Sequence, residues 1–245
     1  MNCVVWMLGR GASIACNLVW DVPRHWLDCD HDALEGKIKA ALQVEMAQPT
    51  VNTLPYKRLL AELAKRTPPG WQHRFLTTNW DTLLQREMDA LRLTTAPDWL
   101  PETHVFHLNG AVEALRESDG VRRRSPFLLE TDAASHRSAS VEFNQALQFI
   151  VWRKVFVVVG ISFSCPTDRG LLAVLHSVED NLPVGFAWWL LVNQDRESAE
   201  AVAALIGAAL PKAVVTYVAT PFERWVADGM PELVAAKILQ PASVP

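Results

Sequence analysis

The sequence predicts an α/β fold in which a mostly parallel sheet carries helices on both faces. Three observations predict it. Continuously apolar runs of strand length recur along the chain, as in strands buried on both faces. Amphipathic or Ala-rich helical segments separate these runs. Glycines and polar side chains follow the strands, at ends that line one edge of such a sheet. The chain has 245 residues, half of them hydrophobic, so we expect one domain spanning 1–245.

The apolar runs give the expected order of elements. Strands are expected at 3–8, 74–76, 105–110, 154–160, 186–192 and 213–218, the third ending at a glycine. Helices are expected at 32–46, 56–65, from 85 onward, at 141–152, 169–175, 197–210 and 221–238, the last broken at 229–231. The mainly helical stretch 18–70 is longer than a crossover needs, so we interpret part of it as a helical insertion. The polar stretch 113–140 is interpreted as a loop-rich insertion.

Composition and charge exclude several classes of protein. A net charge of −4 gives no basic footprint for direct nucleic acid binding, and the run 122–124 of three arginines is expected to be a solvated loop. The four cysteines form no Cys-x-x-Cys pair, which excludes a zinc ribbon of ordinary spacing. No apolar run approaches the roughly 18 residues that span a membrane, so a cytoplasmic protein is expected.

The first strand ends in Gly9-Arg10-Gly11-Ala12-Ser13, where two glycines and small residues precede a helix. Such a turn lets the backbone approach a ligand closely and aims amides at anionic oxygens, as in phosphate-binding loops. A Gly-x-Gly sequence is also common in tight strand–helix turns without a ligand. The residues leave both interpretations open.

The second strand ends in Thr77-Thr78-Asn79-Trp80-Asp81, and good helix formers follow. Asn79 and Asp81 therefore present an amide and a carboxylate at the carboxyl edge of the sheet, where ligands bind in open α/β sheets. Asn and Asp are also favoured as helix caps, which is the alternative role.

The later strand ends are polar or small as well. His107 and Asn109 lie two residues apart, so alternation in a strand would put both on one face, either in a site or in a turn. Gly160 to Ser164 follow the strongest buried strand, and Asn193 follows the next. Because these ends meet at one edge, they predict a nucleotide-sized site.

Together these stretches resemble the sirtuin-like family, the NAD-binding domains related to NAD-dependent deacylases. Residues 9–13 are similar to the family's Gly-Ala-Gly-Ala-Ser loop, and 77–81 to its Thr-Thr-Asn-Tyr-Asp. Residues 107–110 resemble its His-Leu-His-Gly, and 159–164 its Gly-Tyr-Ser-Phe. The matches run in family order over residues 3 to about 225.

The resemblance implies a Rossmann-like fold that binds NAD, as substrate or ligand, across the sheet edge. It assigns the pyrophosphate to Gly9, Gly11, Ala12 and Ser13. It assigns the nicotinamide ribose to Asn79 and Asp81, and the adenosine side to Gly160, Ser162, Phe163 and Asn193. Without a Cys-x-x-Cys pair the chain looks like the zinc-free bacterial branch, which hydrolyses NAD to nicotinamide and ADP-ribose in anti-phage defence. No metal is expected.

Two departures from the family pattern bear on catalysis. Arg10 stands where the family has Ala, and Asn109 stands where it has its catalytic His. A neutral amide cannot act as a general base near neutral pH. The candidate catalytic residues are therefore Asn79, which would position a water, Asp81, Asn109, and His107, which would replace the missing base.

Other functions follow from the same departures. Asn109 favours a nucleotide-binding scaffold subunit without catalysis as the alternative, and a deacylase or an ADP-ribosyl transferase fits the residues less well. The ten Trp suit a chain that works with a protein partner or as a homo-oligomer.

Overall fold

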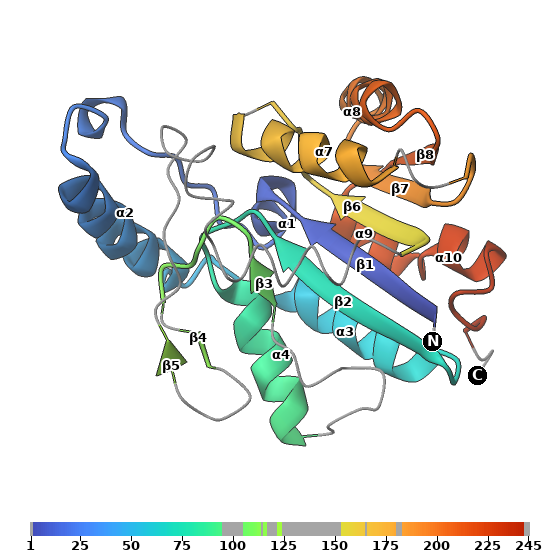
Figure 1. Ribbon diagram of the computed structural model, residues 1–245. Coiled ribbons are helices and arrows are strands. Elements are labelled where there is room, and N and C mark those ends of the chain that lie inside the picture. Colours follow the sequence, from blue (N-terminus) through green and yellow to red (C-terminus); the bar gives the residue numbers. More distant parts are fainter. Residues whose placement is uncertain are drawn as a thin grey trace.

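The computed structural model describes residues 2–94, 105–113, 115–116, 122–123, 153–164, 166–179 and 183–242. Within them the chain forms a six-stranded parallel sheet of order β3-β2-β1-β6-β7-β8 (Figure 1). Its strands are β1 (Asn2–Leu8), β2 (Trp71–Thr77), β3 (Phe106–His107), β6 (Val155–Val159), β7 (Trp188–Asn193) and β8 (Val214–Ala219). The predicted α/β, Rossmann-like fold class is confirmed. The order reverses between β1 and β6, the switch point at which ligands bind in doubly wound sheets.

The helices connect the strands as the periodicity predicts. They are α1 (Arg10–Ile14), α2 (His31–Met46), α3 (Leu54–Arg66), α4 (Leu83–Thr94), α7 (Pro166–Glu179), α8 (Arg196–Ala209), α9 (Phe222–Ala227) and α10 (Pro231–Ala235), with the 3-10 helix η1 (Arg24–Trp26). The predicted break at 229–231 separates α9 from α10, where Gly229 and Met230 both have positive φ.

Alternate side chains of β1 enter two hydrophobic clusters, one on each face of the sheet. Val4, Trp6 and Leu8 pack with side chains of α3, α9 and α10. Val5 and Met7 pack with side chains of α7 and α8. Figure 1 shows α7 and α8 lying along the β6–β8 half of the sheet. The sheet is thus buried on both faces, as its continuous apolar strands require.

The helical region 18–70 divides into two parts with different positions. Helix α3 places Tyr56, Leu59 and Leu63 in the same hydrophobic cluster as Trp6, so it serves as the crossover from β1 to β2. The segment with η1 and α2 lies beyond the carboxyl ends of β1 and β2 (Figure 1). This second part therefore borders the edge where the site is expected.

Three expectations differ from the structure or lie outside it. The strand expected at 105–110 has only two residues, because the chain turns after His107 and Gly110 takes a φ of 82°. Part of the basic run expected as a loop forms a two-stranded antiparallel pair, β4 (Leu115–Arg116) with β5 (Arg122–Arg123). The helix expected at 141–152 and most of the stretch 113–140 lie outside the described residues.

A buried histidine links β1 to β2. Trp6 Nε1 donates to His73 Nδ1 at 2.9 Å, and His73 Nε2 lies 2.9 Å from Thr67 Oγ1. The Thr67 hydroxyl itself donates to the Leu63 carbonyl, so the neutral Nε2–H tautomer of His73 satisfies every partner. Burial lowers the pKa of His73 to about 3.

We therefore expect His73 to make stability fall at acid pH. An unfolded histidine has a pKa of about 6.5, so between that value and the folded one the unfolded state binds the extra proton. Above pH 6.5 His73 does not reduce the free energy of unfolding. Between pH 6.5 and pH 5 this group alone should lower the free energy of unfolding by about 2 kcal/mol. Urea unfolding of native protein and the His73→Gln variant at pH 7 and pH 5 measures it. Gln retains an acceptor for Trp6 but does not titrate, so an unchanged pH dependence in the variant contradicts the prediction.

Both ends of the described chain attach to the connection between α3 and β2. The buried Arg66 donates from Nε to the Gln240 carbonyl at 2.7 Å, and from Nη1 to the Gly229 carbonyl and to Glu62 Oε2, both at 2.9 Å. At the other end, the Asn2 amide donates to the Gly70 carbonyl at 3.1 Å. Figure 1 accordingly shows the start of β1 close to the chain that follows α10, away from α2. No helix within the described segments is long and apolar enough to cross a membrane.

Candidate functional site at the switch point

The glycine loop after β1 packs directly against the loop after β6. The Gly9 amide donates to the Val159 carbonyl at 2.9 Å, and the Gly11 amide to the Gly160 carbonyl at 3.0 Å. A Cβ on Gly11 would lie 2.6 Å from Gly160 Cα, and one on Gly160 would lie 2.4 Å from Gly11 Cα. Gly160 also has a φ of +61°. These glycines are therefore required for the two loops to meet, whatever ligand binds above them.

A hydrogen-bonded network joins Asn79, Ser13 and Asp81 at this point. Asn79 Nδ2 donates to the Gly9 carbonyl at 2.8 Å and to Ser13 Oγ at 2.7 Å. Ser13 Oγ donates to Asp81 Oδ2 at 2.6 Å, while Asp81 Oδ1 accepts the Leu83 amide at 3.1 Å. Asp81 thus takes the capping role that its sequence position left open, at the start of α4, and it also holds Ser13 of the glycine loop, a contact that the sequence did not indicate.

The three side chains of this network differ in their exposure to solvent, and therefore in whether they can contact a ligand. Ser13 and Asp81 are buried, whereas Asn79 is only half-buried. Burial raises the pKa of Asp81, and the hydrogen bonds from Ser13 and the Leu83 amide oppose that rise. Both Asn79 donations go to the protein, and within the described residues its Oδ1 has no donor. Asn79 Oδ1 is therefore the atom of this network best placed to accept a hydrogen bond from a water or a ligand.

Two further side chains lie beneath the network. The phenol of Tyr56 interacts with the Ser13 hydroxyl, and its burial, followed by the charge of Asp81, raises its pKa well above the ordinary value. Burial likewise raises the pKa of the Cys16 thiol to about 12. Both groups stay neutral at physiological pH, so neither adds a charge beside the network. Periodicity marks Tyr56 only as a core residue, and nothing in the sequence indicated this contact.

His107 and Asn109 meet the same turn from β3, although Asn109 lies past the end of the strand. Asn109 Nδ2 donates to the Thr78 carbonyl at 2.8 Å, and His107 Nδ1 lies 3.4 Å from the Asn79 carbonyl. Both side chains are buried, His107 to 2% exposure. The strand alternation from which we expected a shared face does not apply here. The turn brings both side chains to the 78–79 backbone instead.

The residues assigned to the adenosine side follow β6 and β7. Ser162 is exposed, with its hydroxyl 2.6 Å from that of Ser164, whereas the side chain of Phe163 is fully buried between α7 and the sheet. Asn193 is half-buried at the end of β7, next to the Val192 carbonyl that accepts the Gly160 amide at 3.3 Å. Ser162 and Asn193 can therefore offer side-chain polar atoms to a ligand, and Phe163 only its backbone.

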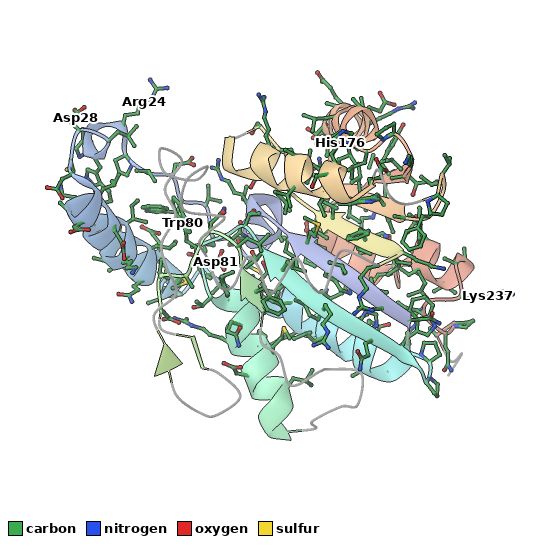
Figure 2. All side chains as sticks on the ribbon, in the orientation of Figure 1. Arg24, Asp28, Trp80, Asp81, His176 and Lys237 are labelled. Carbon is green, nitrogen blue, oxygen red and sulfur yellow. The ribbon has the colours of Figure 1, made fainter. Side chains whose placement is uncertain are left out.

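Figure 2 places the site in the molecule. Trp80 and Asp81 lie between the carboxyl edge of the sheet and α2, while Arg24 and Asp28 point outward from the far end of the η1 segment. Among the residues that the structure describes, no group of three or more His, Cys, Asp or Glu side chains is arranged to hold a metal ion.

An ion pair that the sequence did not indicate lies beside the glycine loop. Arg10 Nη2 is 2.6 Å from Asp21 Oδ2, and the two side chains are 55% and 71% exposed. The sequence marked Arg10 only as a departure from a small residue. The sequence around Asp21 does not indicate this ion pair, because Asp21 lies in a segment without periodicity and its partner is eleven residues away.

Solved structures of Sir2 proteins match this arrangement over nearly the whole chain. One is a Sir2 mutant with a peptide and NAD, with a TM-score of 0.50 and 13% identity over 94% of this chain and 92% of that one. A second is Sir2 with the inhibitor EX-527, 2'-O-acetyl-ADP-ribose and a deacetylated peptide, with a TM-score of 0.50 and 14% identity over 94% and 93%. A third, Sir2 bound to an acetylated peptide, has a TM-score of 0.51 and 14% identity over 94% and 92%.

Sequence comparison adds no relative to these. No family model matches the chain, and no curated protein matches it. At identities this low the likeness to the Sir2 structures shows the fold alone. The chain has the sirtuin-like fold, with the polar ends of its strands gathered at one edge.

Proposed function

We propose that this protein binds NAD across the carboxyl edge of the sheet and hydrolyses it to nicotinamide and ADP-ribose. The observation that carries the proposal is the network at the switch point. Asn79 joins the Gly9 carbonyl to the Ser13 hydroxyl, and the buried Asp81 holds Ser13 from behind. NAD and 2'-O-acetyl-ADP-ribose in the Sir2 structures support this class of ligand.

The proposed reaction breaks the bond between the nicotinamide nitrogen and the ribose carbon. Both electrons of that bond leave with nicotinamide, and a water oxygen bonds to the carbon and loses a proton. Asn79 Oδ1 would accept a hydrogen bond from this water. The Asp81 carboxylate would place negative charge behind a sugar that becomes cationic, a form of electrostatic stabilisation. The His107 imidazole lies against this turn and would take the proton, since Asn109 cannot.

The setting of this activity is proposed from the resemblance of the sequence motifs. We place the protein in the zinc-free bacterial branch, acting in the cytoplasm in anti-phage defence, with a protein partner or a second copy of itself. The lack of any Cys-x-x-Cys pair supports this branch, because the zinc-bearing enzymes need such pairs.

The experiment is calorimetric titration of the protein with NAD, followed by product analysis of the same sample. We expect binding and release of nicotinamide and ADP-ribose in equal amounts. His107→Ala should bind NAD and release nicotinamide at least about 100-fold more slowly, the contribution typical of a general base. Native protein that neither binds nor cleaves NAD would refute the proposal.

A second function is favoured by the position of Asn109. Its amide donates to the Thr78 carbonyl and braces the turn of Asn79, a structural role that needs no catalysis. A nucleotide-binding scaffold subunit would then bind NAD or ADP-ribose without turnover. Binding without any nicotinamide release, in the same titration, would select this alternative.

A further inference from the structure

The glycine loop does not offer a full set of free amides to a phosphate group. The amides of Gly9 and Gly11 donate to carbonyls of the β6 end, and the Ala12 amide donates back to the Gly9 carbonyl at 2.9 Å. An amide that already donates to a protein carbonyl gives at best a shared hydrogen bond to a second acceptor. Helix α1 has only five residues and adds little of a helix dipole. With these three amides already donating to the protein, a cation close to the loop would strengthen the binding of a pyrophosphate.

Arg10 supplies a cation at this point. It stands between the two glycines, and its guanidinium is half exposed to solvent at the carboxyl edge of the sheet. A guanidinium recognises phosphate oxygens through paired N–H donors, and it stays charged at any physiological pH. At present one of its nitrogens contacts the Asp21 carboxylate at 2.6 Å.

We propose that Arg10 is the anion-binding residue of this edge and that Asp21 is the carboxylate that a pyrophosphate displaces from it. The inference rests on the proposed function, and it names the residue that would bind the phosphate groups of the nucleotide. Both side chains of the ion pair are more than half exposed, so the pair is screened by water and contributes little to stability. A pyrophosphate group carries more charge than one carboxylate and can engage both edges of the guanidinium. Exchange is therefore favourable.

The exchange also concerns the segment in which Asp21 lies. Asp21 precedes η1, in the part of the insertion that borders the site. While it holds Arg10, it acts as an internal competitor of the ligand. Removing its charge should therefore strengthen binding, whereas removing a merely structural ion pair would leave binding unchanged or weaken it.

The test is calorimetric titration with two probes, inorganic pyrophosphate and ADP-ribose. Arg10→Ala should bind ADP-ribose about 10- to 100-fold more weakly than native protein, because charged hydrogen bonds are lost. Asp21→Asn should bind ADP-ribose at least about threefold more tightly than native protein. Arg24→Ala and Asp28→Asn are matched controls, because these residues carry the same charges and point outward from the η1 segment (Figure 2). The controls should bind like native protein.

The outcomes separate this inference from the proposed function. Pyrophosphate binding that depends on Arg10, without binding of ADP-ribose or NAD, would uphold the role of Arg10 and refute the proposed function. Two results would overturn the role of Arg10 and leave the proposed function standing. One is an ADP-ribose affinity of Arg10→Ala within twofold of native protein. The other is an ADP-ribose affinity of Asp21→Asn no tighter than that of native protein. No binding of either probe would overturn both.

Discussion

Replacing Gly160 with Ala is expected to destabilise the protein by about 3 kcal/mol or more, as the sum of two costs. The first is conformational, because Gly160 has a φ of +61°, which side chains other than Gly adopt at a penalty. The second is steric, because the new Cβ would lie 2.4 Å from Gly11 Cα and 2.7 Å from its amide nitrogen. Those atoms belong to backbone, which cannot rotate away as a side chain can. Urea unfolding at fixed pH measures the change.

Two other glycines separate these costs. Gly70 has a φ of +84° with nothing within 4 Å of its added Cβ, so Gly70→Ala should lose only about 1 kcal/mol, from conformation alone. Gly36 lies inside α2 with open space around it, and Gly36→Ala should gain about 0.5–1 kcal/mol. If Gly160→Ala proves no worse than Gly70→Ala, the close packing of the two loops is wrong.

Asn79→Ala is expected to reduce NAD turnover by about 100-fold or more, as when a positioning contact moves by an ångström. The substitution removes the amide that fixes the Gly9 carbonyl and Ser13 Oγ, and with it the Oδ1 acceptor proposed for the water. The measurement is nicotinamide release at saturating NAD, with binding determined separately by titration. Turnover should fall far more than affinity.

The matched control is Asn52→Ala. Asn52 is exposed, and its side-chain Oδ1 accepts the Leu54 amide at the start of α3 rather than a group of Asn79, Ser13 or Asp81. This variant should turn over NAD like native protein. Full activity in Asn79→Ala would remove this residue from the mechanism and leave the network a purely structural one.

The parts of the fold that depend on local pattern could be predicted from the sequence. Continuous apolar runs located β1 and β6 within a residue or two, because a strand buried on both faces must be apolar throughout. The polar residues at the strand ends located the edge, because parallel strands all present their carboxyl ends there. That reasoning brought Asn79, Ser13 and Gly160 to one place before any contact was known.

The contacts themselves could not be predicted. Strand alternation predicts that Asn109 shares a face with His107. The chain leaves the strand after His107, however, because it turns there and Gly110 takes a positive φ. The glycines leave both a ligand-binding turn and a plain tight turn open, and neither interpretation indicates that the loop after β6 packs against the positions where their Cβ atoms would lie. Tyr56 beneath Ser13 and Asp21 beside Arg10 are tertiary partners. No periodicity or spacing encodes such pairs, since each depends on where a distant segment packs.

The attachment of both chain ends at Arg66 and Gly70 has a practical consequence. Asn2 and Gln240 are held at the amino side of the sheet, opposite the edge that carries Asn79. An affinity tag, a fluorophore or an entire fused protein joined at either end would project away from the ligand. The same closeness would let a short linker join the two ends and new ends be opened elsewhere, with the sheet and its polar edge left intact.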